Sequence, residues 1–190
     1  MSIARANILS VDVEKNGLHG PTFSVGAVVI DRAGMIVDSF RARCPIVGEP
    51  RPFVTREVLP ALVDYVETHR DYKSLRDDFW AWFSRHKEQC HVFADCGWPS
   101  EARFFIALAE DDLESRYTSG PYPLHDVATL MLACGADPDT NREDFVGIAV
   151  EMRGRKHDPW WDALVSARCA LQALASLGTL NGVLQPVNGN

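Results

Sequence analysis

The sequence predicts a single α/β domain, in which helices pack on the faces of a mixed β-sheet. Three observations lead to this fold class. Three apolar, β-branched segments come first along the chain and are separated by turn residues. Short apolar segments then alternate with segments whose apolar residues recur at helical spacing. The length of 190 residues, 46% of them hydrophobic, suits one domain with its own core.

The expected order of elements is β-β-β-α-β-α-β-α-α, which gives a five-stranded sheet. The first strand covers residues 8–14, and the second covers 23–30. A turn signal at 31–34 separates the second strand from a third at 35–44, so these two strands should form an antiparallel hairpin. A proline-rich loop at 45–52 follows.

The next segments alternate between helix and strand. Apolar residues from Leu75 to His86 form the stripe of an amphipathic helix. Residues 90–94 form a short apolar strand that runs into Asp95. A second helix should start beyond it, with Ser100 as its N-cap and Glu101 in its first turn.

The last third of the chain is predicted to be mainly helical. A fifth strand at 121–125 precedes helices at 127–134 and 142–152. The final helix runs over 159–177, with a proline in its first turn and Gly178 as its stop. One domain therefore spans residues 1–180, and a loose polar tail follows at residues 181–190.

Composition excludes several classes of protein. A net charge of -7 argues against a protein that coats nucleic acid by bulk positive charge. Five cysteines without a C-x-x-C pair argue against a disulfide framework and a structural zinc site. No run approaches the roughly 20 apolar residues of a membrane span, so we expect no membrane association. The first residues lead into a strand rather than a signal peptide, which favours a cytoplasmic protein.

Asp12 and Glu14 stand two residues apart at the end of the first strand. Side chains at i and i+2 of a strand point to the same face, so both carboxylates should converge at one edge of the sheet. Two neighbouring acids repel each other unless a cation lies between them, and carboxylate oxygen is a preferred ligand of Mg²⁺ and Mn²⁺. This pair therefore predicts a site for a divalent metal ion.

His157 and Asp162 flank the start of the final helix. His157 lies just before the helix and Asp162 lies one turn inside it, so both can face the same cavity. Asp158, directly before a proline, is expected to be the helix cap. Two further acids, Asp95 and Glu101, follow the fourth strand and can also be explained as a turn former and a first-turn charge.

Taken together and in order, these acids and the histidine resemble the DnaQ-like DEDDh 3′–5′ exonucleases, which have the ribonuclease H-like fold. Further runs carry the resemblance: SVDVEKNGL at 10–18, FSVGAVVID at 23–31 and LHDVATL at 124–130. The similarity extends from about Ile8 to Ala175.

The resemblance implies a two-metal mechanism with Mg²⁺ or Mn²⁺. Asp12, Glu14 and Asp162 match the family's metal ligands, and His157 matches its general base, which takes a proton from the attacking water.

The middle motif departs from the family pattern. The spacing of the run from Gly97 to Phe105 places Glu101 where the family has its catalytic aspartate. Asp95 has the expected residue type but lies six residues earlier. We favour Asp95 for its residue type and keep Glu101 as the alternative metal ligand.

Residues expected to contact nucleic acid lie inside or beside these motifs: Asn16, Leu18, Trp98, Arg155, Lys156 and Trp160. Leu18 matches a family leucine that wedges beside the terminal bases. The tryptophans can stack on bases, although core packing is the alternative, and it is preferred for at least one of Trp160 and Trp161. The basic run 153–156 directly precedes His157 and can contact phosphates.

The sequence therefore predicts a metal-dependent exonuclease that shortens single-stranded nucleic acid from its 3′ end, with RNA favoured over DNA. The altered middle motif supports an alternative, in which the domain has little catalysis and binds nucleic acid or protein. Several relatives pair as homodimers. The aromatic-rich segment 79–83 has surplus apolar surface for such a contact, or else belongs to the core.

Overall fold

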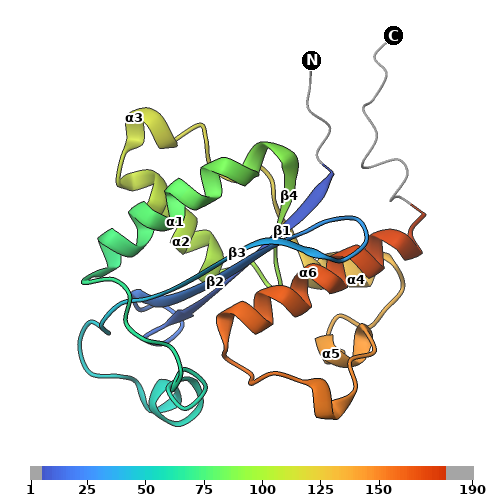
Figure 1. Ribbon diagram of the computed structural model, residues 1–190, viewed down its shortest axis with the longest axis horizontal. Coiled ribbons are helices and arrows are strands. Elements are labelled where there is room, and N and C mark those ends of the chain that lie inside the picture. The colour runs from blue at the N-terminus through green and yellow to red at the C-terminus, as the bar shows by residue number, and fades with distance from the viewer. Residues whose placement is uncertain (1–5, 179–190) are drawn as a thin grey trace.

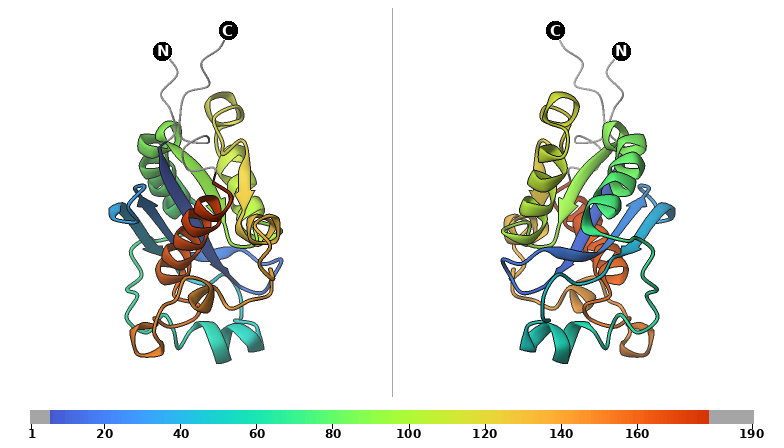
Figure 2. Two further views of the ribbon diagram at one scale, coloured as in Figure 1. Left: turned by 90° about the vertical axis from the view of Figure 1, so that its right-hand side faces the viewer. Right: turned by 90° about the vertical axis from the view of Figure 1, so that its left-hand side faces the viewer.

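The computed structural model describes residues 6–178, so the predicted tail at 181–190 lies outside the described residues. A five-stranded sheet forms the centre of the domain, with strand order β3-β2-β1-β4-β5. Helices α1 and α2 lie on one face and α6 lies on the other (Figures 1 and 2). No helix among residues 6–178 is long and apolar enough to cross a membrane.

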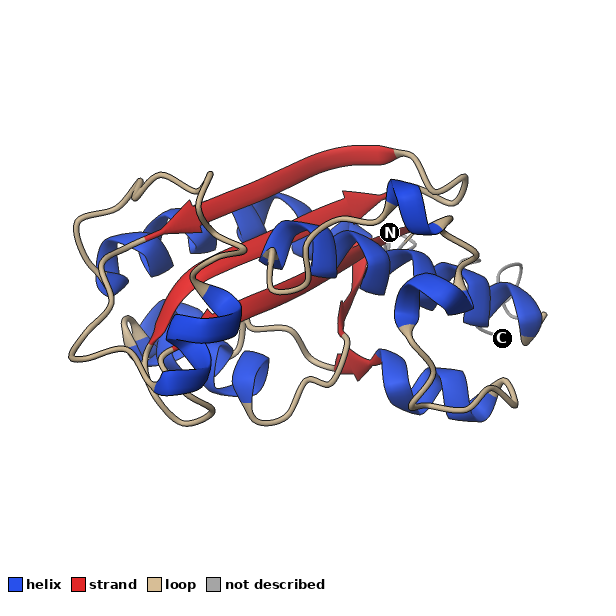
Figure 3. Cartoon of the chain, turned by 90° about the horizontal axis from the view of Figure 1, so that it is seen from below, coloured by secondary structure: helices blue, strands red, loops and turns tan. Residues whose placement is uncertain are grey.

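The sheet is mixed, as predicted. β1 pairs antiparallel with β2 and β2 antiparallel with β3, whereas β1–β4 and β4–β5 are parallel pairs. Figure 3 shows the long strands next to one another and helices on both sides of them. The strands are β1 (Asn7–Lys15), β2 (Thr22–Ile30), β3 (Ile36–Arg43), β4 (Cys90–Ala94) and β5 (Leu124–Asp126).

Six α-helices and three shorter turns are found in the described part of the chain. The helices are α1 (Tyr72–His86), α2 (Ser100–Glu110), α3 (Leu113–Arg116), α4 (Val127–Ala133), α5 (Arg142–Phe145) and α6 (Pro159–Ser176). A π-helical turn covers Val54–Val58, and 3₁₀ turns cover Lys87–Gln89 and Val150–Met152.

β1 contributes alternate side chains to two hydrophobic cores. Leu9 and Val11 belong to the core beneath α1 and α2, whereas Ile8 belongs to the core beneath α4 and α6. Because side chains alternate along a strand, the residues in register with Ile8 face α6. Asp12 and Glu14 are in that register, so the α6 face of the sheet carries both carboxylates.

The aromatic segment of α1 is largely core. Phe79 and Phe83 are fully buried, Trp82 is nearly so, and Trp80 packs partly buried against them. The Phe79 ring makes an edge contact with Phe104 of α2 at 5.0 Å between centroids. Burial of these rings supports the core interpretation of residues 79–83.

One predicted helix is wrong. Residues 142–152 form the short helix α5 and a separate 3₁₀ turn, because Gly147 has a φ of 69° and ends the helical conformation. The amide of Ile148 then bonds back to the Glu143 carbonyl at 2.8 Å, which closes the end of α5. The first residue of α5, Arg142, lies beside Asp95 at the carboxyl end of β4.

Two smaller predictions also need correction, and one short helix was not predicted. α2 has Pro99 as its N-cap and Ser100 as its first residue, without a side-chain cap. The fifth strand is shifted to Leu124–Asp126, since a proline at 123 cannot donate to the sheet. The short helix α3 was not predicted; Asp112 caps it by accepting from the Ser115 amide at 3.2 Å.

Candidate functional site

A glycine in β2 lets the start of α6 lie directly on the sheet. Gly26 stands opposite Asp12 in the β1–β2 pairing. A Cβ atom at Gly26 would lie 2.1 Å from the Pro159 carbonyl carbon and from the Trp160 nitrogen, closer than atoms can approach. The absence of a side chain therefore brings the first turn of α6 beside Asp12.

The start of α6 is fixed by its cap. The Asp158 carboxylate accepts hydrogen bonds from the Trp160 amide at 3.0 Å and the Trp161 amide at 3.2 Å, which confirms its predicted role. The hydroxyl of Tyr65 donates to the same carboxylate. These contacts hold the residue before the cap, His157, at the edge of the sheet.

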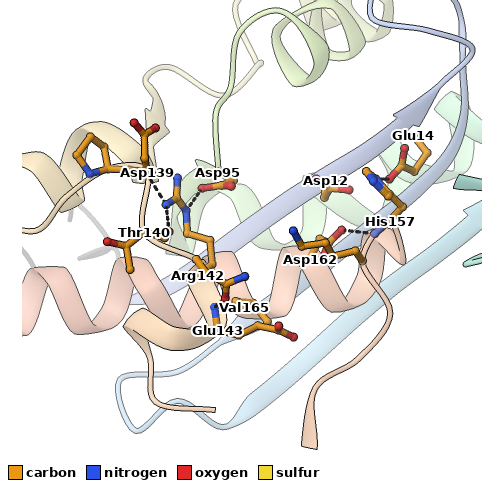
Figure 4. A pocket seen from close by; sticks show the side chains of 13 residues that line it. Asp12, Glu14, Asp95, Asp139, Thr140, Arg142, Glu143, His157, Asp162 and Val165 are labelled. Carbon is orange, nitrogen blue, oxygen red and sulfur yellow. Dashed lines mark hydrogen bonds and ion pairs between the residues drawn. The ribbon is translucent and has the colours of Figure 1, made fainter. Parts of the chain in front are cut away.

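His157 joins the two elements that carry the acids. Its Nδ1 lies 3.1 Å from Glu14 Oε1, and its amide donates to Asp162 Oδ2 at 2.9 Å (Figure 4). Its φ of 67° is rare for a residue other than glycine. Ligand atoms of Glu14, His157 and Asp162 all lie within 4.8 Å of one another, a spacing that suits a bound cation.

The carboxylates of this cluster hold their protons unusually tightly. Desolvation raises the pKa of Asp12 well above its usual value, and the charges of Asp162, Glu101 and then Glu14 raise it further. Burial also raises the pKa of Asp162 to about 7. For Glu14, burial raises the pKa, and the hydrogen bond with His157 offsets part of this effect. Crowded, poorly hydrated carboxylates are a suitable donor set for a hard divalent cation.

The two candidates for the middle acid lie in different surroundings. Glu101 is 5% exposed and accepts a hydrogen bond from the Val13 amide of β1 at 3.3 Å. Burial raises its pKa to about 7. Asp95 is more open, and Arg142 Nε donates to its Oδ1 at 2.5 Å. Glu101 also affects the pKa of Asp12 more strongly than Asp95 does.

Two cavities meet at the acid cluster. One has a volume of about 460 Å³ and the other about 560 Å³. Asp12, Glu14, Asp95 and His157 line both, so these groups form the boundary between the cavities. A substrate bound across this boundary places one part on each side of the acids.

The larger cavity presents exposed apolar side chains beside the acids. Leu18, Phe53 and Trp98 line it and are 59%, 51% and 72% exposed. The Phe53 ring meets the His157 ring edge-on, with 5.4 Å between centroids. Sequence reasoning placed Leu18 and Trp98 at the site but missed Phe53, which lies just beyond the predicted proline-rich loop and has no motif around it.

The polar atoms of Asn16 bind the neighbouring loop. Its Nδ2 donates to the carbonyls of Val47 at 3.1 Å and Glu49 at 2.9 Å, and its Oδ1 accepts from the Arg51 amide at 2.8 Å. Asn16 therefore ties the loop that leads to Phe53 to the end of β1.

The other predicted substrate residues lie at differing distances from the cavities. Lys156 lines the smaller cavity. Arg155 forms an exposed ion pair with Asp64 at 3.1 Å. Trp160 packs against the α6 core, and the Arg41 guanidinium lies 4.2 Å from its ring centroid. Neither Arg155 nor Trp160 is among the described residues that line the two cavities.

Arg142 is a second site residue that sequence reasoning missed. The sequence placed it at the start of a helix, and α5 does begin there. Only the fold brings it to Asp95, 47 positions away in the chain.

The fold has a counterpart among solved structures. A structure described as "3'-end specific recognition of histone mRNA stem-loop by 3'-exonuclease" matches with a TM-score of 0.66 and 14% sequence identity. The fold is ribonuclease H-like. The match covers 92% of this chain and 65% of that one, so this chain spans slightly less than two thirds of the other's length. No family model and no curated protein matches the sequence.

Proposed function

We propose that this protein is a metal-dependent 3′–5′ exonuclease of the DnaQ-like DEDDh type that acts on single-stranded nucleic acid, with RNA favoured over DNA. One observation carries the proposal: ligand atoms of Glu14, His157 and Asp162 converge within 4.8 Å, and Glu14 and His157 line both cavities. The ribonuclease H-like fold and its likeness to a 3′-exonuclease support the same function.

The donor set fits two ions of Mg²⁺ or Mn²⁺. Asp12, Glu14 and Asp162 would hold them, with Glu101 or Asp95 as the fourth carboxylate. The raised pKa values indicate that these carboxylates lack enough compensating positive charge of their own. When bound, the ions would supply Lewis-acid stabilisation of the charge that develops on the scissile phosphate.

His157 would accept the proton of the attacking water. Its Nδ1 faces Glu14, which leaves Nε2 to take the proton. The hydrogen bond to Glu14 raises the pKa of the imidazole and fixes the ring's direction. The edge contact with Phe53 restricts the orientation of the His157 ring from another side.

The larger cavity would take the terminal nucleoside. Its exposed Leu18, Phe53 and Trp98 offer apolar and aromatic surface beside the acids, and bases stack well on such surfaces. Charged and polar residues make up most of the lining of the smaller cavity, which would suit the phosphates of the remaining strand. The preference for RNA is supported by the similar solved structure, in which a 3′-exonuclease recognises a histone mRNA stem-loop.

The test uses 5′-labelled single-stranded RNA and DNA of one sequence, with Mg²⁺, Mn²⁺ or chelator. The proposal predicts a ladder that shortens from the 3′ end with either metal, no cleavage with chelator, and faster loss of RNA. Asp12→Asn should abolish the ladder in a protein whose circular dichroism is unchanged. A full ladder from Asp12→Asn would contradict the proposal.

A binding module is the second candidate, and the contact between Arg142 and Asp95 favours it, because an arginine already neutralises one of the candidate ligands. Calorimetric titration with Mn²⁺ separates the two functions. If the protein is an exonuclease, we expect it to bind two Mn²⁺ ions and Asp12→Asn to reduce this binding. A binding module predicts nucleic-acid binding that is unchanged by metal.

A further inference from the structure

We propose that Arg142 binds a phosphate of the substrate strand upstream of the scissile bond, on the floor of the smaller cavity. This inference rests on the proposed function and specifies how the strand crosses the site. The terminal nucleoside lies in the larger cavity, and the preceding nucleotides lie in the smaller one.

The Arg142 guanidinium is held rigidly. Nε donates to Asp95 at 2.5 Å, and Nη1 donates to the carbonyls of Pro138 and Thr140, both at 2.7 Å. The side chain is 19% exposed and lines the cavity. Within residues 6–178 no hydrogen bond is found for Nη2, which leaves its two N–H donors for an anion. A guanidinium fixed in this way loses little entropy on binding phosphate.

Charge balance in the cavity points to the same role. Its lining is rich in carboxylates, which repel a polyanionic strand. Two lining residues carry a permanent positive charge, Arg142 and Lys156. The metal ions at the acid cluster would neutralise the scissile phosphate. Arg142 and Lys156 are therefore the residues of this cavity that can neutralise the phosphates of the strand upstream of the scissile bond.

The position of Arg142 selects an upstream phosphate. In Figure 4, Arg142 and Asp95 form one group, and Glu14 and His157 form another on the far side of Asp12. The scissile phosphate, which is attacked beside His157, would therefore lie next to Glu14 and His157. Arg142 lies at the other end of the acids, inside the cavity that the terminal nucleoside does not fill.

The experiment compares two substrates on the same protein. The p-nitrophenyl ester of a nucleoside 5′-monophosphate has a terminal nucleoside and a scissile phosphate but no upstream phosphate. A ten-nucleotide single strand with the same sugar has both. Arg142→Met should lower kcat/KM for the ten-mer roughly tenfold to hundredfold more than it lowers kcat/KM for the ester, as expected for a charge-assisted hydrogen bond that only the ten-mer loses.

Arg85→Met is the matched control, because Arg85 is an exposed arginine on α1, across the sheet, and its loss changes the net charge equally. It should leave both substrates unaffected. An equal loss on both substrates for Arg142→Met would overturn the proposal, because Arg142 would then act by positioning Asp95. No loss on either would also overturn it.

Binding gives a second readout that does not need catalysis. The slope of log Kd against log salt for the ten-mer should fall by about 0.7 in Arg142→Met, the value for one phosphate contact to a single strand. If the wild-type protein cleaves neither substrate, the proposed exonuclease function fails, and this slope alone decides whether Arg142 contacts phosphate. An unchanged slope would refute the contact.

Discussion

The α6 side and the β4 side of the acid cluster are built differently. On the α6 side, His157 contacts both acids: its Nδ1 lies 3.1 Å from Glu14 of β1, and its amide donates to Asp162 at 2.9 Å. On the β4 side, Glu101 and Asp95 are alternative candidates for the fourth carboxylate ligand. Arg142 donates a hydrogen bond to Asp95 at 2.5 Å.

The difference shows where spacing along the sequence determines a site. On the α6 side, the position of each side chain within its element is local, since it follows from the two-residue repeat of a strand and the first turn of a helix; the packing of α6 against Gly26 then brings the two elements together. The β4 side depends on where a strand ends, where a helix begins and which distant loop reaches them. The following predictions test this contrast, in order of decreasing expected effect.

The largest effect should come from the α6 side. His157→Ala removes the proposed general base, and we expect kcat on single-stranded RNA to fall about 10²- to 10⁴-fold. His86→Ala is the matched control, since His86 contacts Asp38 at 2.7 Å beside β3, away from the cavities. A His157→Ala protein with wild-type kcat would show that the α6 side is not the catalytic side.

The β4 side should respond unequally to its two acids. Glu101→Gln should lower kcat/KM roughly tenfold more than Asp95→Asn, because Glu101 is buried against β1 whereas Asp95 has its charge matched by Arg142. Both variants keep the side-chain shape. Steady-state kinetics with saturating Mn²⁺ measure the ratio, and the reverse ranking would assign the metal to Asp95.

Gly26→Ala should disturb the α6 side through packing. The added Cβ would collide with the first turn of α6, and we expect the free energy of unfolding to fall by about 1–3 kcal/mol or more in urea denaturation. Gly120→Ala is the control, since the nearest atom to its Cβ, at 3.3 Å, belongs to the Tyr122 side chain. Equal stability of the two variants would contradict the described approach of α6 to β2.

The smallest effect concerns pH. Glu101 and Asp162 have pKa values raised to about 7 by burial, so the folded protein binds their protons more tightly than the unfolded chain does. The free energy of unfolding therefore falls as pH rises from roughly 4 to 7. Metal-free protein should melt at a lower temperature at pH 8 than at pH 5.5.

Two additions sharpen the pH experiment. Saturating Mg²⁺ should raise Tm at pH 8, because a ligand that binds only the folded state stabilises it. Asp162→Asn should flatten the dependence of Tm on pH in the absence of metal. A metal-free Tm that rises between pH 5.5 and pH 8 would contradict the description of the cluster as protonated by burial.

Much of the fold was predictable because its signals are local. The strand β1 and the hairpin of β2 and β3 were predicted from apolar, β-branched runs and turn residues, and the strand order is that of a mixed sheet, as expected. The helix predicted at 142–152 was wrong because Gly147, which ends α5 at positive φ, was interpreted as part of a helical pattern. Propensity alone does not show which glycine ends a helix.

The candidate site was predictable in part for the same reason. Asp12 and Glu14 share a face because strands alternate, and the Asp158 cap fixed the start of α6. Phe53 and Arg142 were missed because each reaches the site through contacts with residues far away in the chain, His157 for Phe53 and Asp95 for Arg142. The choice between Asp95 and Glu101 could not be made from the sequence, because a carboxylate after a strand and a carboxylate in the first turn of the next helix can both face the same metal site.

The most direct test of the central claim is a time course with 3′-end-labelled single-stranded RNA, Mn²⁺ and the wild-type protein. We predict that the first labelled product is the terminal nucleoside 5′-monophosphate, and that chelator prevents its release. Labelled oligonucleotides as first products, or no release with metal present and the protein folded, would contradict it.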